Sequence, residues 1–262
     1  MGAAPSQLAE TFDPVRLSGR SAPGPLVLLC EHASNRVPAE LAGLGLSADI
    51  LQSHIAWDPG AAAVARAMAA RLDAALIEST VSRLVADCNR LPDAADLVPE
   101  ISETTPVPGN RGLDARGRAR RIAMAHAPFH AAVAGLIEER LAAGRTIAVV
   151  SVHSFTPVYR GVARPWHVGI VHDADRRMAQ PMLAGLGRLP NVAVGDNRPY
   201  APPDGVYYSL ARHAGTRNLP CAMIEIRNDE IATEEGQRLW AGRFCDILAG
   251  MGYAARKGAY RQ

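Results

Sequence analysis

The sequence predicts an α/β fold, a three-layer α/β/α sandwich around a mixed, mainly parallel sheet. Short unbroken apolar runs, typical of buried parallel strands, alternate with longer segments of helical periodicity. A length of 262 residues and a hydrophobic content of 48% suit one large domain with a packed core. We therefore expect a single domain over residues 24–262, preceded by a flexible, polar, proline-spaced arm over residues 1–23.

The first half of the domain contains three expected strands and one helix. Residues 25–30 form an apolar run that ends abruptly at Glu31-His32. An alanine-rich helix is expected from residue 58 to about 76, with Asp58 and Pro59 placed as its N-cap and first residue. Residues 75–80 and 84–86 suggest two further strands.

Residues 91–112 are rich in Pro, Asp, Glu and Gly and predict a long surface loop, a feature that is often functional. Residues 114–143 predict one or two helices, interrupted or entered near Pro128. The remaining expected elements are strands at 146–152, 168–171, 192–194 and 221–227, and helices ending near 187, over 207–214 and over 233–251.

Charge and composition exclude several classes of protein. The formal charge of +2 does not indicate a surface that binds nucleic acid. No apolar run approaches the roughly 20 residues that span a bilayer. The N-terminus lacks a secretory pattern, and its match to a myristoylation pattern at Gly2 is of a kind common by chance. The four cysteines are dispersed, which favours a reduced cytoplasmic setting. No glycine-rich phosphate loop follows the first strand.

Titratable residues fall where predicted strands meet the ligand-binding edge of the sheet. His32, with Glu31 before it, follows the first strand; His153 and Glu225 fall at two later ones. Two histidines and a carboxylate from different strand ends suit a catalytic zinc, with Glu225 as general base. A single strand-end histidine more often makes an ordinary hydrogen bond, so the hypothesis depends on the joint placement.

The third metal ligand is open at this point. Asp58 stands at a predicted helix start, where a carboxylate is equally expected as a cap. Glu31 and Asn35 flank His32 and are rival ligands. Because a neutral amide is a poor zinc ligand, Asn35 is better interpreted as a substrate contact.

Several arginines have both a structural and a functional interpretation. Residues 82–90 alternate apolar and polar groups, as in a half-buried strand with ion-paired arginines, but Arg83 and Arg90 could instead clamp substrate carboxylates. Arg227 shares a strand face with Glu225 and binds either substrate or Asp229. Residues 196–200 form either a plain turn or a substrate contact through Arg198.

The other histidines give weaker signals. His126 and His130 stand four apart, as two ligands on one helical face would, but Pro128 lies between them and no acid follows. We expect these two to have no metal role, and His54, His167 and His213 to be structural.

Six short motifs spread over about residues 25–250 together resemble the N-formylglutamate amidohydrolase family. In chain order they are CEHASNRVP, HIAWDPGA, SRLVADCNR, VSVHSFTP, GDNRPY and IEIRND. The resemblance implies a phosphorylase/hydrolase-like fold similar to zinc carboxypeptidases and zinc-dependent cell-wall amidases. It implies that His32 and His153 are metal ligands and that Glu225 is the general base, with Asp58 chosen by position as the remaining ligand.

The family's named reaction is the hydrolysis of N-formyl-L-glutamate to formate and L-glutamate, a step of histidine degradation. The expected cofactor is zinc, although manganese, iron or cobalt suit similar ligands. Two other functions stay open: a zinc peptidase or N-acyl amino acid amidohydrolase with a different substrate, and a non-catalytic metal- or ligand-binding domain. The expected partner is a small anionic N-acyl amino acid, bound by Asn35, Arg83, Asn89, Arg90, Arg198 and Arg227.

Overall fold

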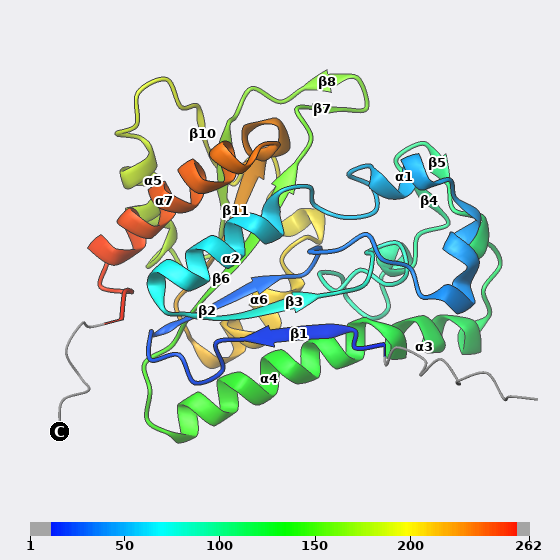
Figure 1. Cartoon of the computed structure of the whole chain (residues 1–262), viewed down its shortest axis with the longest axis horizontal. Helices are drawn as coiled ribbons and strands as arrows, with labels where there is room; N and C mark the ends of the chain where they lie inside the picture. Colours follow the sequence, from blue (N-terminus) through cyan, green and yellow to red (C-terminus); the bar gives the residue numbers. More distant parts are fainter. Residues whose placement is uncertain (1–11, 256–262) are drawn as a thin grey trace, which may run out of the picture.

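The computed structural model describes residues 12–255, which are organised around a seven-stranded sheet (Figure 1). Four of the six neighbouring strand pairs are parallel and two are antiparallel. The predicted mixed, mainly parallel sheet of an α/β fold is therefore confirmed. In sheet order the strands are β1 (Val15–Ser18), β3 (Ala75–Ser79), β2 (Leu26–Cys30), β6 (Ala148–Phe155), β11 (Cys221–Arg227), β9 (Val168–Val171) and β10 (Val194–Asp196).

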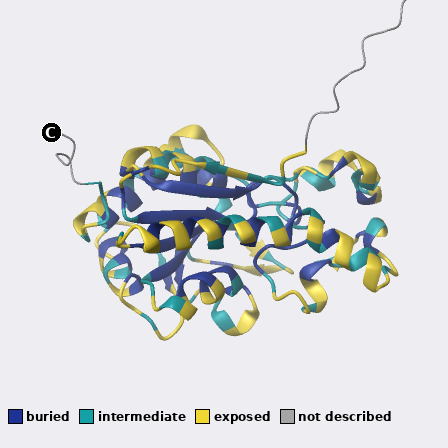
Figure 2. Ribbon diagram, turned by 90° about the horizontal axis from the view of Figure 1, so that it is seen from below, coloured by how far each residue is buried: buried dark blue, intermediate teal, exposed yellow. Residues whose placement is uncertain are grey.

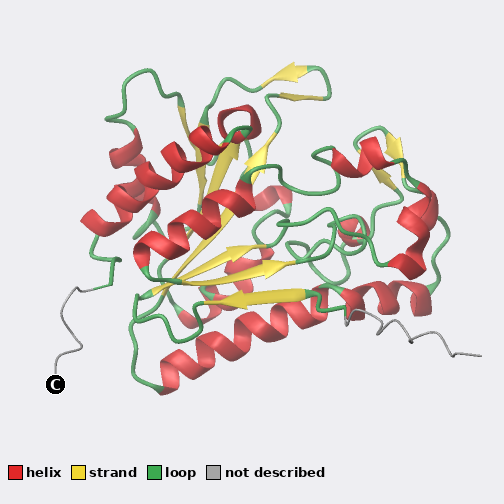
Figure 3. Cartoon of the chain, viewed as in Figure 1, coloured by secondary structure: helices red, strands yellow, loops and turns green. Residues whose placement is uncertain are grey.

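Helices cover both faces of this sheet, which gives the three layers (Figures 1 and 3). One face carries α2 (Ala61–Leu72), α5 (Ala179–Leu186) and α7 (Glu234–Gly250). The opposite face carries α4 (His126–Ala142) and α6 (Tyr208–His213). Two further helices, α1 (Ala48–Gln52) and α3 (Ala115–Met124), lie in the segments that lead up to α2 and α4.

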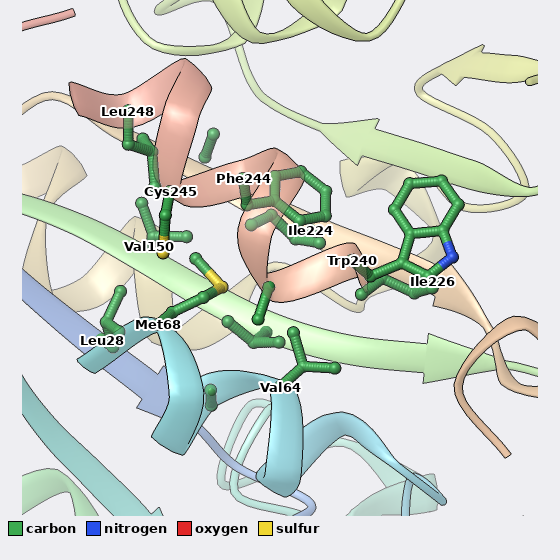
Figure 4. Packing of buried hydrophobic residues seen from close by; sticks show 14 of the residues in the cluster. Leu28, Val64, Met68, Val150, Ile224, Ile226, Trp240, Phe244, Cys245 and Leu248 are labelled. Atoms are coloured by element: carbon green, nitrogen blue, oxygen red, sulfur yellow. The ribbon is translucent and has the colours of Figure 1, made fainter. Parts of the chain in front are cut away.

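The apolar runs become central strands because their alternate residues can be buried on two faces. In β2, Leu26 and Leu28 belong to the core beneath α2 and α7, whereas Val27 and Leu29 belong to the core beneath α4. Figure 4 shows Met68 of α2 and Trp240 of α7 packed in the first of these cores. Figure 2 shows the buried strands between helices whose outer faces are exposed. No helix among residues 12–255 has the length and apolarity needed to cross a bilayer.

The start of α2 differs from the sequence prediction. Its N-cap is Gly60, with a φ of 82°, and not Asp58. A side chain on Gly60 is excluded because its Cβ would lie 2.5 Å from the carbonyl oxygen of Ile231. The Asp58 carboxylate is consequently free of the capping role and available to other partners.

Three other segments differ from their predictions. Val15–Ser18, part of the expected arm, pairs with β3 as an antiparallel edge strand; residues 1–11 of that arm lie outside the described residues. Residues 84–86, expected as a strand, form turns. The predicted break in residues 114–143 is present, but it falls at Ala125. Pro128 fits into the first turn of α4, where its missing N–H has no helical partner to lose.

Two small hairpins extend from the domain (Figure 1). The first, β4 (Ile101–Ser102) with β5 (Thr105–Pro106), lies within the predicted surface loop 91–112. The second, β7 (Val158–Tyr159) with β8 (Val162–Ala163), follows directly after β6. Both hairpins supply walls of the pocket described next.

Candidate functional site

The strand ends place His32, His153 and Glu225 at one edge of the sheet. His32 lies two residues after β2, which pairs with β6. His153 of β6 and Glu225 of β11 are direct register partners. Because neighbouring strands pleat in phase, side chains at partnered positions point to the same face. The structure thus brings these three predicted residues together.

A buried cluster of two imidazoles and one carboxylate lies at this edge. Oδ2 of Asp58 is 2.8 Å from Nδ1 of His153 and 3.3 Å from Nδ1 of His32. One ligand atom from each of the three residues lies within 4.8 Å of the others. Ligands at 2.0–2.1 Å from a tetrahedral zinc stand roughly 3.3 Å apart. The spacing of His32, Asp58 and His153 therefore fits a metal ion.

Asp58 reaches the cluster through local backbone contacts. Its amide N–H donates to the carbonyl oxygen of His32 at 3.0 Å, which ties the loop before α2 to the end of β2. Burial alone would raise the pKa of Asp58, but His32 and His153 hold it far below its usual range. The aspartate is thus an anion between two imidazoles.

Asp87 fixes the ring orientation of His32 and was missed by the sequence analysis. Nε2 of His32 lies 2.7 Å from Oδ1 of Asp87, and the Arg83 guanidinium donates to Oδ2 of the same carboxylate at 2.7 Å. Burial opposes ionisation of Asp87, but Arg83 and then His32 lower its pKa well below the normal value. A carboxylate bound to the distal nitrogen of a ligating histidine is a common feature of metal sites. With Nε2 bound in this way, Nδ1 of His32 is left to face the cluster.

Glu31 stands on the opposite side of the His153 ring from Asp58. Its Oε2 accepts a hydrogen bond from Ser151 at 2.6 Å and lies 3.2 Å from Nε2 of His153. Burial would raise the Glu31 pKa, yet His153 and Ser151 lower it to about 2. Burial would lower the pKa of His153, but Glu31 and Asp58 raise it well above its usual value. This position favours Glu31 as a support for His153 over the rival interpretation as a ligand.

Glu225 is the acid of the site whose charge state changes near neutrality. Its side chain is buried, and Oε2 has no hydrogen-bond partner among residues 12–255. Burial raises the Glu225 pKa to about 7, although the nearby His153 lowers it in part. A carboxyl group with such a pKa can both accept and release a proton at physiological pH.

These groups open into a pocket of about 260 Å³. Of the arginines predicted to bind substrate, Arg83 and Arg90 line the pocket, as does Asn89. Arg83 is bonded to Asp87 and lies 3.4 Å from Asp58, and Arg90 pairs with Asp96 at 2.6 Å. Both guanidinium charges are therefore already balanced. Asn89 donates to the carbonyl of Val206 and accepts from the amide of Ser209, which are structural contacts.

Three predicted substrate contacts are not part of the pocket wall. Asn35 donates to the carbonyl of Leu51 at 2.9 Å. Arg227 pairs with Asp229 at 2.7 Å and with Glu230 at 3.3 Å, so the structural alternative foreseen for it is the observed one. Arg198 is exposed, and its backbone carbonyl lies against Gly169, where an added Cβ would be only 1.8 Å away.

The pocket also contains residues that the sequence analysis did not single out. Tyr159, Arg160 and Tyr200 line one part of it, and Glu103 of the other hairpin pairs there with His54 at 2.8 Å. Asp96, Pro99 and residues 101–103 of the predicted surface loop contribute to the same wall. Part of the loop therefore lines the pocket.

A second group of histidines lies behind the site. His130 donates from Nε2 to the carbonyl of Cys88 at 2.8 Å, and its Nδ1 lies 2.8 Å from Nε2 of His213. Nε2 of His126 is 3.0 Å from the carbonyl of Arg90. Burial, followed by neighbouring positive groups, lowers the pKa of His130 to about 3 and that of His213 to about 4. These rings are hydrogen-bonded to the backbone beside Asp87 or to one another.

These depressed pKa values predict an acid-sensitive fold. Unfolded histidine binds a proton below a pH of about 6.5, whereas the folded rings stay neutral until about pH 4 or lower. As far as these two rings determine it, the free energy of unfolding is therefore highest above pH 6.5 and declines as the pH falls toward 4. Urea unfolding of the metal-free protein across this range should show a shallower decline for His213→Gln, whose amide still donates to His130 but does not titrate. An unchanged slope would contradict the assignment.

The chain was compared with known proteins. The family model described as N-formylglutamate amidohydrolase matches residues 24–232. A solved gene product of Agrobacterium tumefaciens is 45% identical, with a TM-score of 0.89 over 92% of this chain and 95% of that one.

A second solved structure, N-formylglutamate amidohydrolase from Ralstonia eutropha JMP134, is 19% identical, with a TM-score of 0.66 over 95% of this chain and 100% of that one. This likeness shows a shared fold. No curated protein matches the chain significantly. The family match covers most of the chain, and the protein belongs to the N-formylglutamate amidohydrolase family.

Proposed function

We propose that the protein is a zinc-dependent amidohydrolase that cleaves N-formyl-L-glutamate to formate and L-glutamate. The observation that carries this proposal is the His32–Asp58–His153 cluster, with its ligand atoms within 4.8 Å, in the same pocket as Glu225. Family membership supports the reaction class. In this proposal residues 24–262 act as one catalytic domain, in a cytoplasmic setting.

The residues that would hold the metal in this proposal are His32 and His153, through their Nδ1 atoms, and the Asp58 carboxylate. Zinc suits two nitrogens and one oxygen, and when bound it supplies Lewis-acid chemistry: it polarises an amide carbonyl and lowers the pKa of water. Asp87 is hydrogen-bonded to Nε2 of His32 and so keeps Nδ1 of that ring directed at the cluster. Glu31 lies 3.2 Å from Nε2 of His153, where its charge would support that ring.

Glu225 carries out the proton transfers. As the carboxylate it accepts a proton from the attacking water, and as the acid it then passes that proton to the departing amide nitrogen. Its pKa of about 7 matches both roles, because neither form is strongly disfavoured near neutral pH.

The dimensions of the pocket favour a small substrate. Its volume of about 260 Å³ lies just below the roughly 300–1,000 Å³ typical of pockets for drug-sized ligands. That volume supports an amino acid derivative over a long peptide. Hydrolysis of a larger N-acyl or peptide substrate is the second candidate, because the pocket is partly open to solvent.

Metal removal and substrate choice test the proposal together. Chelation should abolish formate release from N-formyl-L-glutamate, and added zinc should restore it. N-acetyl-L-glutamate and a glutamyl peptide are assayed as alternative substrates. Turnover of only these two would make the formylglutamate assignment wrong. Metal binding without hydrolysis of any of the three would favour the non-catalytic alternative.

A further inference from the structure

The pocket contains one arginine whose charge is not balanced. Among the residues that line it, Arg83 and Arg90 are ion-paired with aspartates, whereas Arg160 forms no salt bridge within residues 12–255. Its guanidinium lies over the ring of Tyr159, at 5.3 Å from the ring centre. Arg160 is therefore the cation in this wall that is available to an incoming anion.

The backbone at Arg160 has an unusual conformation. Arg160 and Gly161 form the two-residue turn between β7 and β8, with φ values of 49° and 78°. A turn with positive φ at both positions favours Asn or Gly at the first, because the Cβ of other residues lies too close to the following carbonyl oxygen there. An arginine in the left-handed region costs on the order of 1 kcal/mol. Because arginine does not favour this turn, its presence there suggests that the Arg160 side chain has a functional role.

The base of the hairpin is tied to the pocket by Arg164. The Arg164 guanidinium is buried, lies 4.5 Å from the ring centre of Tyr159 and 4.7 Å from that of Tyr200, and donates to the Tyr200 hydroxyl at 3.0 Å. Its backbone N–H donates to the carbonyl of Pro157 at 2.8 Å, across the hairpin. The hairpin thus holds Arg160 in a defined place relative to the pocket.

We propose that Arg160 is the specificity-determining residue that binds the side-chain carboxylate of the substrate. The reacting groups stand on the sheet, in β6 and β11, whereas Arg160 stands at the tip of a hairpin that extends from the end of β6 (Figure 1). Both line the same pocket, so in this proposal the scissile amide lies near the reacting groups and the side-chain carboxylate reaches Arg160. This inference rests on the proposed function for the identity of the substrate.

The enzymatic test compares N-formyl-L-glutamate with N-formyl-L-glutamine, which has the same shape but a neutral side chain. Arg160→Asn should lower kcat/KM for the glutamate substrate by about 10–100-fold, mainly through KM, because a charged hydrogen bond is lost. Its activity on the glutamine substrate should stay within about twofold of the parent. A twofold loss is smaller than the loss expected if Arg160 also made a hydrogen bond with the glutamine substrate. Arg160→Lys, which keeps the charge, should recover part of the preference for glutamate.

Two controls separate charge recognition from damage to the fold. Asparagine suits the turn better than arginine, so the thermal midpoint of Arg160→Asn should equal or exceed that of the parent. Arg188→Asn removes an exposed arginine outside the pocket and should leave both activities unchanged. Equal losses on the two substrates, or no loss on either, would overturn the proposal for Arg160.

Binding measurements keep this inference separate from the proposed function. If the parent protein hydrolyses no N-formyl amino acid, the proposed function fails, but calorimetry with glutarate and its neutral-ended monoamide still tests Arg160. Weaker binding of glutarate alone to Arg160→Asn would support charge recognition. Equal affinity of the parent and variant for glutarate would overturn it.

Discussion

Replacing Glu225 with glutamine is expected to lower kcat for N-formyl-L-glutamate hydrolysis by about 10²–10⁴-fold, the usual contribution of a general acid–base residue. The amide of glutamine fills nearly the same buried space but cannot accept a proton from water. Glu225 is not part of the His32–Asp58–His153 cluster, so the zinc content should stay at the parent value. Formate release measured alongside elemental analysis checks both expectations.

Glu78→Gln provides a matched control for this experiment. Glu78 is also a buried glutamate on a strand, but it pairs with Arg66 at 2.7 Å and lies outside the pocket. Its replacement should affect stability more than kcat. Full turnover by Glu225→Gln would refute the general-base role, and loss of zinc from that variant would instead identify Glu225 as a ligand.

Removing the carboxylate of Asp58 should abolish metal binding as well as catalysis. Asp58→Ala leaves His32 and His153 as two ligands, and it also removes the anion that both imidazoles contact. We expect zinc affinity to fall by more than the roughly 10–100-fold typical of supporting residues. The value of kcat/KM should fall by at least about 10³-fold, because the metal supplies several kcal/mol of stabilisation.

Glu31→Gln identifies the third ligand when it is compared with Asp58→Ala. Glu31 lies on the far side of His153, so its loss should weaken zinc binding by about 10–100-fold while a zinc-loaded enzyme can still be prepared. Competition with a chelator of known affinity measures both variants. A zinc-free Glu31→Gln protein beside a zinc-loaded Asp58→Ala protein would assign the ligand to Glu31.

The sequence was sufficient to bring His32, His153 and Glu225 to one place because that information is local. Each of His32, His153 and Glu225 stands at or near the end of an apolar run, and adjacent parallel strands bring such ends to one edge. Asp58 was harder, since an aspartate before an alanine-rich helix also suits a cap. The structure separates the two roles because Gly60, two residues later, caps α2.

The residues around the cluster could not be predicted because their partners are set by tertiary contacts. The sequence predicted that Asp87 belongs to an alternating strand, whereas its segment forms turns. The Asp87 side chain contacts His32, which lies 55 positions away in the sequence. Arg227 and Arg90 carry the charge expected of residues that bind substrate carboxylates, but each forms an ion pair with a nearby aspartate of the protein. The Arg160-Gly161 pair carried a usable signal, because a glycine between short β-prone pairs is typical of a tight hairpin.

The β7–β8 hairpin lies in the chain between the end of β6 and the start of β9, and Arg164 anchors it by contacts with side chains. None of His32, Asp58 and His153 lies within it. A segment of this kind can be exchanged between related enzymes, or lengthened, without moving the groups that perform the chemistry. Selection for new substrates, in nature or in the laboratory, can therefore act on a few contiguous codons while the reaction itself is preserved.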